Sequence, residues 1–253
     1  MRAAFLCLLF LLGGHSTWSQ ESASDLSIAA ASDLTYCLPV INDAFQKANP
    51  GAVVTVSFGS SGNFFAEIRN GAPFDVFLSA DMEYPRTLAK EGLVEEPVKY
   101  AEGSIVLWTT NGAIDLSHGM AVLRGPAVKR IALANPDHAP YGRAAKAALR
   151  HEHLWDELNP KLVFGENIAQ AAQFVQTGNA EAGFVAMSLV VAQPATKAGS
   201  YFEIPADEYP PIEQAAAVTK SGSGKPLAKA YLAYLQSDPA RKILERFGFR
   251  KQQ

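Results

Sequence analysis

The sequence predicts an α/β fold of two lobes, in which each lobe is a mostly parallel sheet flanked by helices and crossover strands form the hinge. Two observations support this fold. Short apolar runs alternate with segments of helical periodicity, with polar turns rich in Gly and Ser between them, and this alternation occurs twice along the chain. Strands joined by helices pair in parallel, since a crossover helix returns the chain to the same end of the sheet.

The first 23 residues are expected to be absent from the mature protein. Arg2 precedes an apolar run over residues 3–12, and small and polar residues follow from Gly13. This pattern is typical of a secretory signal peptide, because the apolar run is about half as long as the roughly 20 residues of a membrane-spanning helix. We therefore expect an exported protein that begins at residue 24.

The charge of the chain argues against nucleic-acid binding, and its cysteine content argues against a disulfide. The chain has 22 Lys and Arg against 25 Asp and Glu, a net charge of −3, and contains no basic block. Nucleic-acid binding through a face that neutralises phosphates is therefore not expected. Cys7 lies in the signal peptide, so Cys37 alone remains and the mature fold has no internal disulfide.

Residues 24–103 and 206–253 are expected to form the first lobe. Leu38, Ile41 and Phe45 recur at helical spacing after the short apolar run over residues 26–31, which predicts a strand followed by a helix. The same reasoning gives the other elements. Strands are predicted over residues 26–31, 53–58, 75–79 and 214–218, and helices over residues 34–48, 63–70, 82–91, 226–236 and 239–247.

Residues 104–205 are expected to form the second lobe. Its first strand is predicted over residues 103–109, at the boundary between the two lobes. An Ala-rich segment over residues 143–151 predicts a helix. Further strands are predicted over residues 130–134, 162–164 and 182–187, and a further helix over residues 168–177.

Polar residues gather at four junctions where a strand leads into a helix: residues 32–33, 59–62, 139–142 and 165–167. Each junction places free backbone N–H groups at a helix N-terminus beside a hydroxyl or an amide. Four such termini aimed at one point would bind an anion without any Lys or Arg. The alternative is that each is an ordinary helix cap, which is the commoner role of any one of them taken singly.

The sequence contains no complete motif for a metal site or for a catalytic nucleophile. His151 and His153 are two residues apart, so on a helix they face different directions and do not form a metal site. Ser61 lacks the G-x-S-x-G pattern of a hydrolase nucleophile. A secreted serine hydrolase that uses Ser61 is therefore the most distant alternative, and we expect neither an enzyme nor a cofactor.

Six segments carry a family resemblance. They are residues 28–32 (IAAAS), 58–62 (FGSSG), 70–81 (NGAPFDVFLSAD), 135–142 (NPDHAPYG), 181–185 (EAGFV) and 246–249 (RFGF). In this order they resemble the periplasmic molybdate-binding proteins of ABC importers, and residues 70–81 are the most specific part. The resemblance implies a two-lobed periplasmic-binding-protein fold. It also implies a monomer that captures molybdate or tungstate between its lobes and delivers it to a membrane permease.

The resemblance also implies which residues contact the ligand. Carried over by position, the oxyanion contacts fall on Ser32, on Ser61 rather than Ser60, on Tyr141 and on Ile168. These residues contact oxygens of the anion and are not direct ligands of the metal. Asp33 would contribute its backbone N–H, with its carboxylate turned away because like charges repel.

One position departs from the family pattern. Many members place a ligand-binding Tyr where this chain has Ala186. We expect the hydroxyl of Tyr141, from the turn before Gly142, to supply the missing donor; the alternative is a Tyr that packs on the lobe surface.

A pocket of donors rejects protonated phosphate, whose O–H would find no acceptor. A binding protein for sulfate or another small oxyanion remains the nearer alternative, since sulfate differs from molybdate in size alone.

Overall fold

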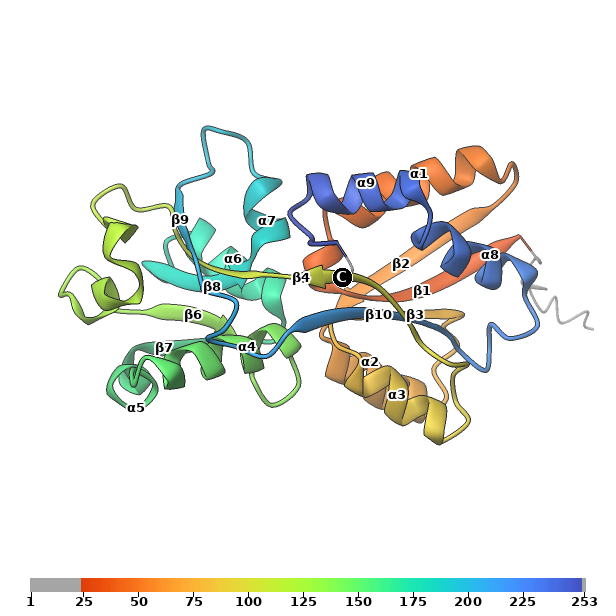
Figure 1. Ribbon diagram of the computed structural model, residues 1–253, viewed down its shortest axis with the longest axis horizontal. Helices are drawn as coiled ribbons and strands as arrows, with labels where there is room; N and C mark the ends of the chain where they lie inside the picture. The colour runs from red at the N-terminus through yellow and green to blue at the C-terminus, as the bar shows by residue number, and fades with distance from the viewer. Residues whose placement is uncertain (1–23, 252–253) are drawn as a thin grey trace, which may run out of the picture.

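The computed structural model describes residues 24–251 and consists of two lobes side by side, each built on a five-stranded sheet (Figure 1). This confirms the predicted fold class. The signal peptide predicted over residues 1–23 lies outside the described residues. Among the helices of residues 24–251, none has the length and apolar character needed to cross a membrane.

The first lobe has the strand order β2-β1-β3-β10-β4. Its strands are β1 (Asp25–Ala31), β2 (Val53–Gly59), β3 (Val76–Ser79), β4 (Val98–Gly103) and β10 (Ile212–Val218). Strand β1 pairs in parallel with β2 and β3, whereas β10 runs antiparallel to β3 and β4. Strand β3 is buried along its whole length, which explains why it is a continuous apolar run in the sequence.

Helices cover both faces of this sheet. The helices are the 3-10 helix η1 (Ser32–Leu34) and α1 (Cys37–Ala48), α2 (Ser61–Arg69), α3 (Glu83–Lys90), α8 (Pro226–Leu235) and α9 (Asp238–Arg246). In Figure 1, α1, α8 and α9 lie above the sheet, and α2 and α3 lie below it. Two separate hydrophobic clusters fill these two layers.

The second lobe has the strand order β7-β6-β8-β5-β9. Its strands are β5 (Ile105–Thr109), β6 (Ile131–Ala134), β7 (Leu162–Gly165), β8 (Ala182–Ala186) and β9 (Ser200–Glu203). Its helices are α4 (Pro140–His151), α5 (Trp155–Leu158), α6 (Ile168–Gln176) and α7 (Met187–Val191), with 3-10 helices η2 (Leu116–Arg124) and η3 (Asn159–Lys161). Strand β6 pairs in parallel with β7 and β8, and β5 runs antiparallel to β8 and β9. One hydrophobic cluster forms the core of this lobe.

The chain crosses between the lobes twice. Strand β4 ends at Gly103 and β5 begins at Ile105, so Ser104 alone separates them. The second crossing runs from the end of β9 at Glu203 to the start of β10 at Ile212. Strands β4 and β10 pair with each other, so the two strands that meet the hinge form one edge of the first sheet.

Two predicted boundaries are wrong at points that affect the site. The helix predicted over residues 143–151 begins at Pro140, because proline fits the first position of a helix, where no N–H is needed. The helix predicted over residues 34–48 is divided into η1 and α1. Tyr141 and Asp33 therefore both lie within short N-terminal turns of helix rather than in the connecting loops.

Candidate functional site

The N-termini of η1, α2, α4 and α6 meet at a small cavity between the lobes. Helices η1 and α2 belong to the first lobe, and α4 and α6 to the second. The cavity is small, with a volume of about 10 Å³, which is room for about one water molecule. It is lined by Ala31, Ser32, Asp33, Gly59, Ser60, Ser61, Ala80, Ala139, Pro140, Tyr141, Asn167 and Ile168. The four polar junctions of the sequence thus converge on one point.

Ser60 and Ser61 form the wall of the cavity at the start of α2. The Ser60 hydroxyl caps the helix by accepting from the N–H of Asn63 at 3.2 Å, and it also bonds Nδ1 of His138 at 2.9 Å. The Ser61 hydroxyl accepts from the N–H of Ala80 at 3.0 Å. Ser61 is the first residue of α2, so its own N–H has no acceptor within the helix.

Ser32 bridges the two lobes. Its hydroxyl donates to Oδ1 of Asn167 at 3.1 Å and accepts from the N–H of Ala169 at 3.3 Å. Asn167 caps α6 by accepting from the N–H of Gln170 at 3.0 Å. Ile168 lies between these contacts as the first residue of α6, so its N–H has no acceptor within the helix.

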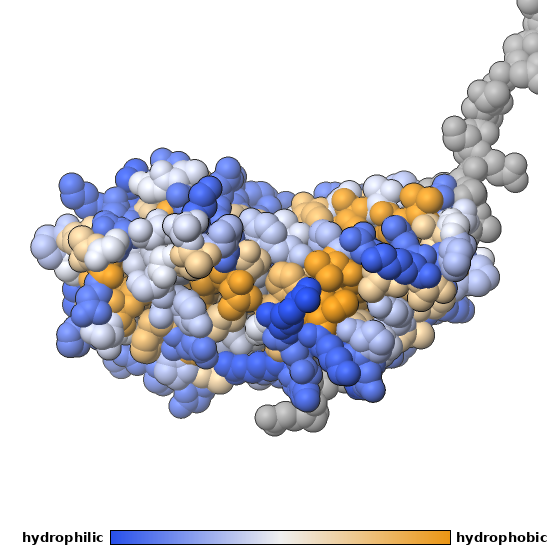
Figure 2. All heavy atoms as spheres, turned by 90° about the horizontal axis from the view of Figure 1, so that it is seen from above, coloured by the Kyte–Doolittle hydropathy of each residue, from blue (hydrophilic) through white to orange (hydrophobic). Residues whose placement is uncertain are grey.

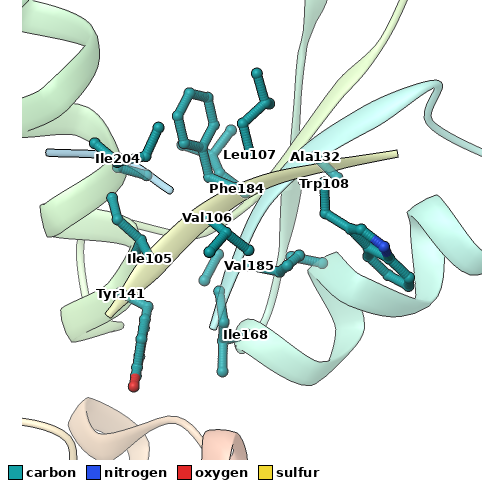
Figure 3. Packing of buried hydrophobic residues seen from close by; sticks show 14 of the residues in the cluster. Ile105, Val106, Leu107, Trp108, Ala132, Tyr141, Ile168, Phe184, Val185 and Ile204 are labelled. Atoms are coloured by element: carbon teal, nitrogen blue, oxygen red, sulfur yellow. The ribbon is translucent and has the colours of Figure 1, made fainter. Parts of the chain in front are cut away.

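Tyr141 contacts the first lobe through its hydroxyl. In Figure 3 this hydroxyl points out of the core of the second lobe toward the ribbon of the first. It donates to Oδ2 of Asp33 at 3.0 Å, and Nε2 of Gln214 donates to the same oxygen at 2.8 Å. In this structure the single proton of the Tyr141 hydroxyl is donated to Asp33, which favours a role in holding Asp33 over the expected donation to a ligand. The alternative of a surface Tyr is wrong, because Tyr141 is 2% exposed.

The backbone of Tyr141 still belongs to the cavity. Tyr141 is the second residue of α4, where Ala139 is the N-cap and Pro140 the first helical residue. Its N–H therefore lies in the first turn, where no intrahelical carbonyl is within reach.

Asp33 is the charged group nearest to this site. It is 1% exposed, and its Oδ1 has no hydrogen-bond partner among the described residues. Burial raises the pKa of the Asp33 carboxyl to about 7, against the lowering effect of hydrogen bonds from Tyr141, Gln214 and the N–H groups of Asp33 and Leu34. Burial, and next the nearby Asp33, raise the pKa of the Tyr141 hydroxyl well above its usual range.

The lobes are in direct contact around the cavity. The N–H of Gly62 donates to the carbonyl of His138 at 2.9 Å, and a Cβ at Gly62 would lie 2.5 Å from that oxygen. Arg143 of α4 forms an ion pair with Asp81 and donates to the hydroxyl of Tyr84 at 3.1 Å. The space-filling view shows no open channel between the lobes on the face seen (Figure 2). The structure is therefore a closed form, which Gly62 permits by having no side chain.

Two groups near Asp33 have no signal in the sequence. The hydroxyl of Ser188 in α7 donates to the carbonyl of Asp33 at 2.7 Å. Gln214 is fully buried in β10, and its Oε1 accepts from the hydroxyl of Tyr100 at 3.1 Å. Ala186 is the N-cap of α7.

The histidines at the end of α4 lie elsewhere on the surface. Nδ1 of His151 lies 3.3 Å from Oε1 of Glu152, and both residues are exposed. Glu208 brings a third possible ligand atom within 4.8 Å of these two, although it is 56 positions away from Glu152 in the sequence. His153 lies beyond the helix end with a φ of 56° and takes no part in this group.

Comparisons with known proteins agree with this geometry. Residues 26–250 match the family described as bacterial extracellular solute-binding protein. The chain is 39% identical over 244 residues to the molybdate-binding protein ModA of Azotobacter vinelandii, covering 96% of each sequence. It is 38% identical over 230 residues to ModA of Rhodobacter capsulatus, covering 90% of this chain and 89% of that protein. The solved structure of the Azotobacter vinelandii periplasmic molybdate-binding protein matches with a TM-score of 0.84 and 35% identity, covering 90% of this chain and 100% of that one.

Proposed function

From the premise that the chain belongs to the bacterial extracellular solute-binding proteins, we propose that it binds molybdate or tungstate between its lobes and delivers it to the permease of an ABC importer. The protein acts outside the cytoplasm, in the periplasm, and catalyses no reaction. The ligand is cargo, so the protein needs no cofactor of its own.

The convergence of four helix N-termini on one cavity carries this proposal. No Lys or Arg is among the cavity-lining residues of the described chain, whereas hydroxyl and backbone N–H donors are abundant. Helix N-termini carry partial positive charge and unsatisfied N–H groups, which suit an anion. Molybdate at neutral pH has four acceptor oxygens and no proton to donate, so a set of donors alone satisfies it.

We assign the donors as follows. The Ser61 hydroxyl already accepts from Ala80, so its own proton is available to an oxyanion oxygen. The Ser32 hydroxyl keeps its bond from Ala169 and turns its proton from Asn167 to the ligand. The remaining donors are backbone N–H groups at the starts of α4 and α6 and in η1, from Tyr141, Ile168 and Asp33.

The hydrolase alternative has little support in the geometry. His138 bonds Ser60 rather than Ser61, and the Ser60 hydroxyl is occupied as the cap of α2. Both serines are 3% exposed or less, so neither hydroxyl is open to a polypeptide or a large ester in this form.

A thermal unfolding series tests the proposal. A ligand that binds the native state alone raises the unfolding midpoint, and the shift grows with the logarithm of its free concentration once this exceeds Kd. We expect molybdate and tungstate to raise the midpoint of the mature protein, and equimolar sulfate to raise it much less. A shift with sulfate and none with molybdate would instead support the sulfate alternative.

A further inference from the structure

We propose that the hydroxyls of Tyr141 and Ser188 are positioning groups that hold Asp33 between the lobes and slow the release of the oxyanion without touching it. The inference rests on the proposed function, because it assigns these two residues a role in retaining the same ligand. Both residues lie in the second lobe, and Asp33 lies in the first.

The two hydroxyls bind different parts of Asp33. Tyr141 donates to the carboxylate at 3.0 Å, and Ser188 donates to the main-chain carbonyl at 2.7 Å. Tyr141 and Ser188 are 2% and 3% exposed, so neither bond competes with bulk water in the closed form. Asp33 is thereby fixed at its side chain and at its main chain.

The Asp33 carboxylate is also bound to the hinge strands. Gln214 of β10 donates to it at 2.8 Å, and the hydroxyl of Tyr100 in β4 holds the Gln214 amide by donating to Oε1 at 3.1 Å. Gly103, the last residue of β4, leaves room for the Tyr141 hydroxyl, because a Cβ there would lie 2.2 Å from that oxygen. One hydrogen-bonded network therefore links the contacts between the lobes to the strands that lead into the hinge.

Opening the lobes must break both hydroxyl bonds. They join residues of different lobes, so they stabilise the closed form and contribute nothing to an open one. Their loss should therefore speed ligand release and leave ligand capture unchanged. The Tyr141 bond ends on a carboxylate and belongs to the stronger class, so we expect Tyr141→Phe to raise the release rate about tenfold. The Ser188 bond ends on a neutral carbonyl, so we expect Ser188→Ala to raise it about fivefold.

The experiment compares Tyr141→Phe, Ser188→Ala and the double variant with the parent mature protein. Each protein is loaded with labelled molybdate and chased with excess unlabelled molybdate, and the dissociation rate is read from the label that stays bound. Equilibrium titration gives Kd, from which the association rate follows.

Two controls remove a hydroxyl bond within one lobe. Tyr231→Phe is matched to Tyr141→Phe and removes a buried bond from Tyr231 to Asn42, whereas Ser223→Ala removes an exposed bond from Ser223 to the carbonyl of Lys220. Both pairs lie in the first lobe away from the cavity. A loss of general stability would affect Tyr231→Phe as much as Tyr141→Phe, whereas a positioning role affects Tyr141→Phe alone.

We expect faster dissociation in both test variants, a larger increase in the double variant, and association rates within about twofold of the parent. Release rates equal to those of the controls, or slower association with unchanged release, would overturn the positioning role alone. A parent protein that binds no molybdate would overturn the proposed function and the positioning role together.

Discussion

At the scale of single residues, Ser60 and Ser61 are neighbours with different partners. Ser60 caps α2 and bonds His138, while Ser61 directs a hydroxyl with an available proton at the cavity. We predict that Ser61→Ala weakens molybdate binding by about 1.5–3 kcal/mol, the range for hydrogen bonds to charged groups. Ser60→Ala should instead lower the free energy of unfolding by about 1 kcal/mol, as loss of an N-cap does, with a smaller effect on affinity. Calorimetry and urea denaturation separate the two effects, and equal losses of affinity would contradict the assignment.

Asp33 makes stability depend on pH. Burial raises the pKa of its carboxyl from the ordinary value of 3.8 to about 7 in the folded protein, so between these values the folded protein holds a proton that the unfolded chain has released. The free energy of unfolding therefore falls as pH rises through this window. Above pH 7 the whole decrease, on the order of 4 kcal/mol, has taken place.

We predict that Asp33→Asn removes this dependence. Asn is neutral at every pH, so the free energy of unfolding of Asp33→Asn should exceed that of the parent by more at pH 8 than at pH 5, and the two differences should differ by about 3 kcal/mol. Denaturant unfolding of both proteins at the two pH values measures the difference. The same difference at both values would show that Asp33 titrates normally.

The sequence could not reveal the partners of Asp33. Tyr141, Ser188 and Gln214 are 108, 155 and 181 positions away from it. Hydrophobic periodicity and capping patterns relate residues a few positions apart, so they say nothing about contacts of this range. The contact between the Tyr141 hydroxyl and Asp33 could therefore not be predicted from the sequence.

At the scale of elements, the start of α4 determines where the N–H of Tyr141 lies. Gly142 packs against the end of β6, and a Cβ there would lie 2.2 Å from the carbonyl oxygen of Ala134. Because that neighbour is backbone, the first turn of α4 would have to move.

We predict that Gly142→Ala weakens molybdate binding at least tenfold and destabilises the fold by about 1–3 kcal/mol, as overpacking does. The matched control is Gly224→Ala, since a Cβ at Gly224 meets nothing within 4 Å. Affinity of Gly142→Ala equal to that of the control would show that the start of α4 does not contact the ligand.

Elements with a strong apolar pattern could be predicted from sequence, and elements without one could not. Strands β3 and β6 are buried along their whole length and were predicted to within about one residue. Strand β4 was missed, because residues 98–103 (VKYAEG) mix polar and apolar residues at an edge of the sheet. The Pro140 start of α4 was missed because residues 135–142 read as one continuous turn.

At the scale of the whole molecule, two lobes bring together four helix N-termini that are far apart in the chain. The sequence predicts each terminus from its own polar junction, and the alternation of elements predicts the two lobes. That all four meet at one cavity follows only from the sheet order, in which β1, β2, β6 and β7 direct their carboxyl ends toward the hinge. The family resemblance supplied the identity of the ligand, because donors alone do not distinguish molybdate from sulfate.

The central claim is that backbone N–H groups and serine hydroxyls hold the oxyanion without a basic side chain. Anomalous diffraction from crystals of the tungstate-loaded protein tests it most directly, because tungsten marks its own position. The account predicts one strong peak in the cavity between Ser32 and Ser61, with the N–H groups of Tyr141 and Ile168 directed at the oxygens and no Lys or Arg in contact. A peak beside basic side chains elsewhere on the surface, or none between the lobes, would contradict it.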